Sequence, residues 1–309
     1  MTTALYTHPA SLAHVTPEGH PEQIARIRAI EAALADMDLD RRDAPMADDS
    51  VVLRCHPQSH VDTLRNSVPE DDRLVQMDPD TWMSKGSVEA AWRAAGAAVA
   101  AVDAVMAGDA ANAFVATRPP GHHAETEKTM GFCFLGNVAI AAKHALEVHG
   151  LNRVAVVDFD VHHGNGTQDL LWDEPRVRFV SSHQMPLWPG SGERSESGAH
   201  GQITNIPLPT ASDGAHMRAV YEAEVFPMLM DYAPELLIIS AGFDAHRDDP
   251  LAGLNWTTKD FRWVTERLCD VADATCSGRV VSCLEGGYDL DALAVSVATH
   301  VSTLKERGQ

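Results

Sequence analysis

Apolar residues recur at helical spacing in several segments of the chain, which predicts amphipathic helices over residues 22–36, 87–107, 137–149, 215–231 and 259–277. Short apolar runs of strand length lie between them, at residues 113–116, 153–157, 177–180, 236–239 and 280–284. Strands that alternate with helices in this way form right-handed crossovers and a mostly parallel sheet with helices on both faces. The pattern therefore predicts an α/β fold. No repeat or low-complexity linker interrupts it, so we expect one domain over residues 1–309.

A polar cluster follows each of four predicted strands. RPPGHHA comes after 113–116, DFDVHHGNG after 153–157, SAGFDAH after 236–239 and EGGYD after 280–284. The carboxyl ends of parallel strands share one edge of a sheet, where such folds bind ligands. We therefore expect the four clusters to meet in space, and their His, Asp, Asn, Gly and Tyr residues are the components of a metal hydrolase.

Asp160 and His162 stand two residues apart, so in an extended segment their side chains and that of Asp158 point to the same side. A catalytic zinc ion takes three protein ligands from Asp, Glu, His or Cys. Asp244 is a plausible third ligand, because Gly242 lets the chain turn sharply after a buried strand. A lone DxH motif is often an incidental surface loop, so this prediction depends on the clusters meeting.

Two adjacent histidines, His122 and His123, are candidates for proton transfer, because imidazole titrates near neutral pH. Asp158 and Asn165 are available as hydrogen-bond partners, which would make two dyads whose second member fixes the tautomer of the first. Tyr288 follows two glycines and can donate a hydrogen bond to a developing oxyanion. The alternatives are two surface histidines and a Tyr packed after a turn.

Composition excludes several classes of protein. The chain has 44 acidic against 24 basic residues and a formal charge of −20, which argues against a nucleic-acid partner. The first ten residues lack a basic start followed by an apolar stretch, so we expect no secretory targeting and a cytoplasmic location. The alanine-rich window 94–108 is too short to span a bilayer, which predicts a packed helix and no membrane partner.

Five cysteines, an odd number without a CxxC pair, disfavour a disulfide framework and a zinc knuckle. We expect reduced thiols, four of them in or near the core.

The strings RPPGHHA, GFCFLGNVA, VVDFDVHHGNGTQ, SAGFDAHRDDPLAG and EGGYDL resemble the motifs of the histone deacetylase superfamily. That zinc-dependent group contains histone deacetylases, acetoin utilization proteins and acetylpolyamine amidohydrolases. The motifs run in order from His8 to about Leu293, nearly the whole chain. Asn165 and the HPE segment at 20–22 look more like the class II and bacterial branch.

The resemblance implies the arginase-like α/β fold and a role for each motif residue. It implies that Asp160, His162 and Asp244 hold one zinc ion and that His123 is the general base. His122, oriented by Asp158, would be an electrostatic partner or acid. The remaining catalytic positions are Tyr288, which would polarise the acyl carbonyl, and Asn165.

Further positions follow from the same resemblance. An acyl-lysine tunnel would be lined by Phe132 and Trp188, together with Gly131, Gly287 and Leu251. At the position of Trp188, Phe is commoner than Trp in the family. Arg26 would lie beside an exit path for acetate. A structural potassium ion would be bound through backbone carbonyls and Asp158, with contributions from Asp160, His162, Ser181 and Ser182. Dimers and tetramers are common among bacterial relatives, so a homo-oligomer is compatible with this interpretation.

The expected activity is zinc-dependent hydrolysis of the amide of an acetylated amine, giving free amine and acetate. Negative charge should attract cationic amines and acyl-lysine segments. Leu251 stands where some polyamine-selective relatives have Glu, which favours acetyl-lysine or a small acetylated amine, although an acidic residue of the 68–80 loop could serve instead. The alternatives are an acetylpolyamine amidohydrolase, a ureohydrolase with two manganese ions, and a catalytically silent sensor of acetylated ligands.

Overall fold

Eight parallel strands form the central sheet of the computed structural model, which describes residues 2–308. Their order across the sheet is β2-β1-β5-β10-β9-β6-β7-β8. The strands are β1 (Thr3–Thr7), β2 (Asp40–Asp43), β5 (Asn112–Val115), β6 (Val154–Asp158), β7 (Val177–Gln184), β8 (Ile203–Leu208), β9 (Leu236–Ala241) and β10 (Val280–Leu284).

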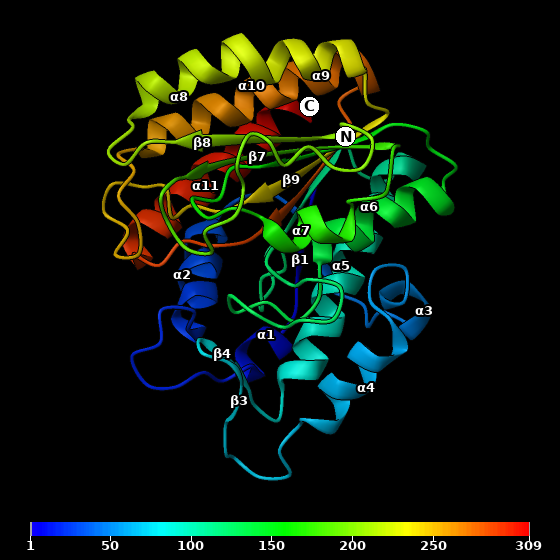
Figure 1. Cartoon of the computed structure of the whole chain (residues 1–309), viewed down its shortest axis with the longest axis vertical. Coiled ribbons are helices and arrows are strands. Elements are labelled where there is room, and N and C mark those ends of the chain that lie inside the picture. The colour runs from blue at the N-terminus through cyan, green and yellow to red at the C-terminus, as the bar shows by residue number, and fades with distance from the viewer. Residues whose placement is uncertain (1, 309) are drawn as a thin grey trace.

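Helices cover both faces of this sheet (Figure 1). On one face lie α3 (Asp49–Val52), α4 (Gln58–Asn66), α5 (Ser87–Ala107), α6 (Asn137–Glu147) and α7 (Asn165–Leu170). On the other lie α2 (Ile24–Leu34), α8 (Gly214–Val220), the π-helical turn η1 (Tyr221–Val225), α9 (Phe226–Tyr232), α10 (Thr258–Cys276) and α11 (Leu290–Arg307). A short helix, α1 (Ala10–Ala13), follows β1. The predicted α/β class with a parallel sheet between two helical layers is confirmed.

The strands divide their apolar residues between two cores. In β5, Ala113 and Val115 belong to the cluster under α5 and α6, whereas Phe114 belongs to the cluster under α10 and α11. This alternation follows from the two-residue repeat of a strand. Strands β5, β6, β9 and β10 are buried along their whole length, which explains why their sequences are continuous apolar runs.

The helix predictions hold, with shifts at the ends. α5 begins and ends where the periodicity predicts, whereas α6 stops two residues early and the 215–231 segment divides into α8, η1 and α9. α5 is long and apolar enough to cross a membrane, but 72% of its most apolar window is buried, as a packed helix requires. All five cysteines are free and buried, one more than predicted.

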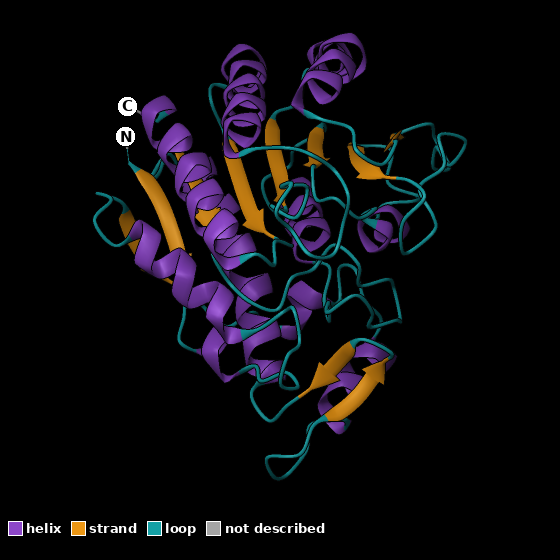
Figure 2. Cartoon of the chain, turned by 90° about the vertical axis from the view of Figure 1, so that its left-hand side faces the viewer, coloured by secondary structure: helices purple, strands orange, loops and turns teal. Residues whose placement is uncertain are grey.

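Several strands were not predicted from the pattern of apolar residues. β2 has the sequence DRRD at the edge of the sheet, where a polar strand carries no apolar signal. The acidic 68–80 segment, expected as a loop, contributes β3 (Val75–Asp78), which pairs with β4 (Thr81–Met83). Figure 2 shows that this hairpin lies apart from the main sheet.

Candidate active site at the carboxyl edge of the sheet

The four polar clusters meet as predicted. Strands β5, β10, β9 and β6 are consecutive neighbours in the sheet, so the segments after their carboxyl ends lie at one edge. Hydrogen bonds join these segments directly. The main-chain N–H of Gly286 donates to Asp160 Oδ2 at 2.8 Å, and that of Val161 donates to Asp244 Oδ1 at 2.9 Å.

Asp160, His162 and Asp244 form a compact buried cluster, with one ligand atom of each within 4.8 Å of the others. Nδ1 of His162 lies 3.2 Å from Asp160 Oδ1 and 3.3 Å from Asp244 Oδ2. Both carboxylates are fully buried. Two carboxylates and one imidazole are a donor set that zinc accepts in catalytic sites.

The electrostatics of this cluster fit a divalent cation. Oδ2 of Asp244 is buried without a hydrogen-bond partner among the described residues. Burial and the charge of Asp160 raise the pKa of Asp244 to about 7. Although burial opposes the charged imidazole, the two carboxylates raise the pKa of His162 to about 10. Buried negative charge is therefore in excess here, and a cation would relieve it.

The three ligand residues meet as predicted, but the backbone geometry that brings them together differs from the prediction at two points. The chain is not extended from Asp158 to His162, because β6 ends at Asp158. In the segment that follows, two main-chain N–H groups each donate to the carboxylate two residues earlier: Asp160 N–H to Asp158 Oδ1 (3.0 Å) and His162 N–H to Asp160 Oδ1 (2.9 Å). Gly242 does not adopt a positive φ. Glycine is needed there because a Cβ atom would collide with the carboxylate of Asp160.

His122 and His123 lie side by side with ring centroids 3.9 Å apart, and both are buried. Nδ1 of His122 is 2.9 Å from Asp158 Oδ2, and its Nε2 is 3.7 Å from Asp160 Oδ2. Nδ1 of His123 is 2.7 Å from Asn165 Oδ1. The structure thus contains both predicted dyads.

The two imidazoles have opposite electrostatic surroundings. Although burial opposes a charged ring, the carboxylates of Asp160 and Asp158 raise the pKa of His122 well above its usual value. Burial and the charges of His122 and His162 lower the pKa of His123 well below its usual value. His122 is therefore the charged member of the pair at neutral pH and His123 the neutral one.

Glu285, which the sequence interpretation did not assign to the site, holds the His-His segment in place. Its buried carboxylate accepts the N–H groups of Gly121 (2.7 Å) and His122 (3.1 Å) and the Ser240 hydroxyl (3.0 Å). Burial raises the pKa of Glu285 to about 7. Its place as the first residue of the EGGYD cluster is the signal that could have identified it.

A cavity of about 360 Å³ opens onto His123 and onto His162 of the ligand cluster. Six predicted tunnel or catalytic residues line it: His123, Tyr288, Gly131, Phe132, Trp188 and Leu251. The other lining residues are His162 and a further set that includes Asp80 of the acidic 68–80 segment, namely His20, Pro21, Pro79, Asp80, Trp82 and Leu187. Gly287 is not among the lining residues.

Two aromatic residues of the cavity lining stand next to candidate catalytic side chains. Trp188 stands edge-on to His123, with ring centroids 4.7 Å apart, and remains 40% exposed. Gly131 has a φ of 56°, and a Cβ atom there would lie within 2.6 Å of both rings. Only glycine fits between His123 and Trp188. The second aromatic wall is Phe132, whose ring centroid lies 5.8 Å from that of Tyr288.

Residues of the β3–β4 hairpin support the Phe132 wall. The N–H of Phe132 donates to Thr81 Oγ1 at 2.9 Å, and that of Gly131 donates to Asp80 Oδ1 at 3.3 Å. His20 reaches the carbonyl of Asp80 at 2.9 Å. The acidic 68–80 segment therefore contributes Asp80 to the cavity lining.

Arg26 lies behind the Tyr288 loop. Its Nε donates to the Gly287 carbonyl (2.7 Å), and another nitrogen donates to the Glu285 carbonyl (2.5 Å). Its guanidinium carbon lies 5.0 Å from the centre of the Tyr288 ring. Asp249 holds the loop from the other side by accepting the Tyr288 N–H at 2.7 Å. Arg26 thus anchors this loop; its predicted place beside an acetate exit stays a prediction.

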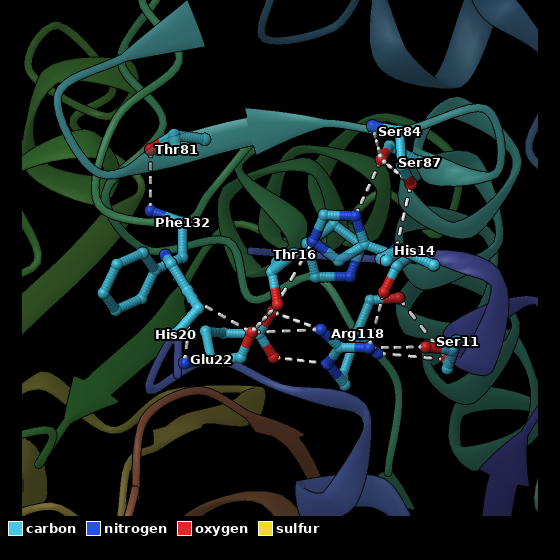
Figure 3. Close-up of polar contacts among 12 residues, drawn as sticks. Ser11, His14, Thr16, His20, Glu22, Thr81, Ser84, Ser87, Arg118 and Phe132 are labelled. Atoms are coloured by element: carbon cyan, nitrogen blue, oxygen red, sulfur yellow. Dashed lines mark hydrogen bonds and ion pairs between the residues drawn. The ribbon is translucent and has the colours of Figure 1, made fainter. Parts of the chain in front are cut away.

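Glu22 is the centre of a buried ion network under this region. It pairs with Arg26 at 3.0 Å and with Arg118, and His14 Nε2 lies 3.5 Å from it. Thr16 donates to its carbonyl at 2.8 Å (Figure 3). Its paired cations lower the pKa of Glu22 well below its usual value despite burial. The network connects the N-terminal segment to the loops of the site.

The predicted potassium residues are buried near Asp158. The Ser181 hydroxyl lies 3.0 Å from His183 Nδ1, and the Ser182 hydroxyl lies 2.7 Å from the Tyr221 hydroxyl. Both hydroxyls therefore have protein partners.

Comparison with known proteins identifies the family. The histone deacetylase domain family matches residues 20–304. The chain belongs to the histone deacetylase family. Within it, the chain is 38% identical to histone deacetylase 14, chloroplastic, of Arabidopsis thaliana, over 95% of this chain and 74% of that protein. It is 37% identical to the histone deacetylase-like amidohydrolase of Pseudomonas aeruginosa, over 91% of this chain and 74% of that one.

The fold of this histone deacetylase family member agrees with that of a solved relative. The HDA15 HD domain superposes with a TM-score of 0.92 at 31% identity, covering 99% of this chain and 88% of that one. The named relatives are deacetylases and amidohydrolases, which supports a hydrolase activity for this chain.

Proposed function

We propose that this chain is a zinc-dependent deacylase that hydrolyses the amide of an acetylated amine to free amine and acetate. The observation that supports this most is the arrangement at the base of the cavity. His123, with a depressed pKa, lines the same cavity as His162 of the ligand cluster and Tyr288. The proposed base, one of the three proposed metal ligands and the proposed hydroxyl donor therefore line one cavity.

Asp160, His162 and Asp244 would hold the zinc ion. When bound, the ion supplies Lewis-acid polarisation of the amide carbonyl and the attacking water. In the proposed mechanism, neutral His123 takes the proton of that water and returns it to the departing amine nitrogen. The imidazolium of His122 offsets the negative charge that develops nearby.

Tyr288 would donate a hydrogen bond to the carbonyl oxygen as it becomes an oxyanion. Burial and the charge of Asp244 raise the pKa of Tyr288 well above its usual value, so the hydroxyl keeps its proton. The aromatic rings of Phe132 and Trp188 would hold the apolar part of an acyl-amine chain and exclude water.

We also propose the potassium ion next to Asp158. Ser181 and Ser182 already use their hydroxyls within the protein, so they would contribute backbone carbonyl oxygens, which suit a hard cation.

For the substrate we propose acetyl-lysine or a small acetylated amine, because Leu251, an apolar residue, lines the cavity where a selective carboxylate would favour polyamines. An acetylpolyamine is the second candidate. It is favoured by Asp80, whose carboxylate also lines the cavity and could receive a distal ammonium group.

Metal analysis combined with an assay on acetyl-lysine peptide, acetylputrescine and acetylspermidine at one salt concentration tests these proposals. We expect about one zinc ion at the Asp160 cluster and release of acetate from the peptide. Two manganese ions at the Asp160 cluster would point to a ureohydrolase, and binding without turnover to a sensor. A preference of about 100-fold or more for the polyamines would overturn the choice of acetyl-lysine, since it corresponds to nearly 3 kcal/mol of discrimination.

A further inference from the structure

A second group of metal-ligand side chains lies outside the active site. Asp103 comes from α5, His144 from α6, and His149 follows the end of α6. Nε2 of His144 and Nε2 of His149 each lie 2.7 Å from the same oxygen, Oδ1 of Asp103. The two imidazole rings have centroids 5.6 Å apart and are inclined by 70°, so their nitrogens converge on one point from different directions.

The imidazoles have few other partners. Among the hydrogen bonds of residues 2–308, no polar group except Asp103 contacts the side chain of either histidine. His144 is almost completely buried, and His149 is about one-quarter exposed. Half of the Asp103 side chain is exposed, so the point of convergence is open to solvent on one side. Ions and water can therefore reach the cluster without any opening of the core.

A small movement of the three side chains would let them coordinate one ion tetrahedrally. Zinc bonds imidazole nitrogen and carboxylate oxygen at about 2.0–2.1 Å, which separates tetrahedral ligand atoms by about 3.3 Å. The nitrogens and oxygen at 2.7 Å would have to separate by about half an ångström. The half-exposed carboxylate of Asp103 is free to make this movement, and water would fill the fourth position.

The cluster is remote from the candidate active site along the strand direction. α5 leads into β5 and α6 leads into β6, so the ends of these helices lie near the amino ends of the strands. The proposed catalytic cluster lies after the carboxyl ends of the same sheet. An ion at one cluster is therefore independent of an ion at the other.

We propose that Asp103, His144 and His149 form a binding site for a divalent transition-metal cation of the zinc class. Two imidazoles and one carboxylate favour Zn²⁺, Ni²⁺ or Cu²⁺ over Mg²⁺ or Ca²⁺, which take oxygen ligands. The helices α5 and α6 pack side by side (Figure 1). The ion would link α5 to α6 and to the segment that follows α6. Because the ion binds the folded chain and not the unfolded chain, it stabilises the fold by mass action.

Equilibrium dialysis against Zn²⁺ tests the site by the difference between variants. We expect His149→Ala to bind about one zinc ion fewer per chain than the wild type. The control is His216→Ala, which removes an exposed imidazole outside the cluster and should leave the number unchanged. Because all three proteins keep the active-site residues, the difference does not depend on whether the proposed catalytic zinc is present.

Thermal unfolding provides the second measurement. Added Zn²⁺ should raise the unfolding temperature of the wild type and of His216→Ala by several degrees more than that of His149→Ala. Asp103→Asn, which keeps the shape of the side chain and removes its charge, should lose the same ion. Equal numbers of bound zinc ions in the wild type, His149→Ala and Asp103→Asn would overturn the proposal and leave a hydrogen-bonded cluster.

Discussion

Oδ1 of Asn165 lies 2.7 Å from Nδ1 of His123, and this contact decides which nitrogen of the imidazole carries its proton. The amide nitrogen of Asn165 donates to Glu125 at 2.7 Å, so the amide oxygen faces His123. Because that oxygen only accepts, Nδ1 of His123 is protonated and Nε2 keeps its lone pair. This is the tautomer that a general base requires.

Replacing His123 with Ala should lower kcat by about 10²- to 10⁴-fold, because positioned proton transfer is lost. The Asp160 cluster is left intact, so the variant should bind as much metal as the wild type. Steady-state kinetics and metal analysis on the same preparation measure both quantities. Wild-type turnover in this variant would rule out His123 as the base.

Asn165→Asp should move the acidic limb of the pH profile of kcat/KM to higher pH. A carboxylate next to Nδ1 stabilises the imidazolium and so raises the pKa of His123, which burial and the charge of His122 lower in the wild type. The base is then protonated, and inactive, at a higher pH. An acidic limb that stays in place would mean that another group controls it.

Tyr288→Phe should lower kcat by about 10²- to 10³-fold, since one donor to an oxyanion contributes roughly 3–4 kcal/mol. The affinity for an uncharged ground-state ligand should change much less. Tyr232→Phe is a suitable control, because the Tyr232 hydroxyl donates to the Arg176 carbonyl on a different part of the fold. Equal kcat values for the two variants would leave Tyr288 as a packing residue.

Asp244→Ala should lose the active-site metal, and with it the activity, because it removes one of three ligands. Asp248→Ala removes a nearby carboxylate that is more than half exposed, and it should keep the metal. Metal content after gel filtration distinguishes the two. Retention of a full complement of metal by Asp244→Ala would exclude this residue as a ligand.

The protein should become less stable as the pH falls below 6.5, and His300 should account for part of the loss. Burial lowers the pKa of His300 to about 3 from an ordinary value of 6.5. Between about pH 3 and pH 6.5 the unfolded chain binds more protons than the folded chain at this residue. Above pH 6.5, therefore, His300 does not reduce the free energy of unfolding. Below pH 6.5 that free energy falls by roughly 1.4 kcal/mol per pH unit for this group until about pH 3.

His300→Gln tests this effect. The glutamine can still contact the hydroxyls of Thr265 and Ser282, which lie 2.7 Å and 2.9 Å from the imidazole nitrogens. Urea unfolding at about pH 7.5 and about pH 5 should show a smaller loss of stability in the variant than in the wild type. The same loss in both proteins would contradict the assignment.

Much of this protein is determined locally by its sequence. The continuous apolar runs of β6, β9 and β10 are long enough to identify strands buried on both faces. Because parallel strands place their carboxyl ends at one edge, the order of the motifs was sufficient to predict that Asp160, His162, Asp244, His122 and His123 come together.

Tertiary structure decided what has no local signal. The role of Glu285 depends on N–H groups more than 160 residues away, and the position of Asp80 depends on a hairpin that packs beside Gly131. The reason for Gly242 is the carboxylate of Asp160 across the sheet edge. Such contacts arise only when distant segments pack, because hydrogen bonding and steric exclusion act over a few ångströms in space and not along the chain.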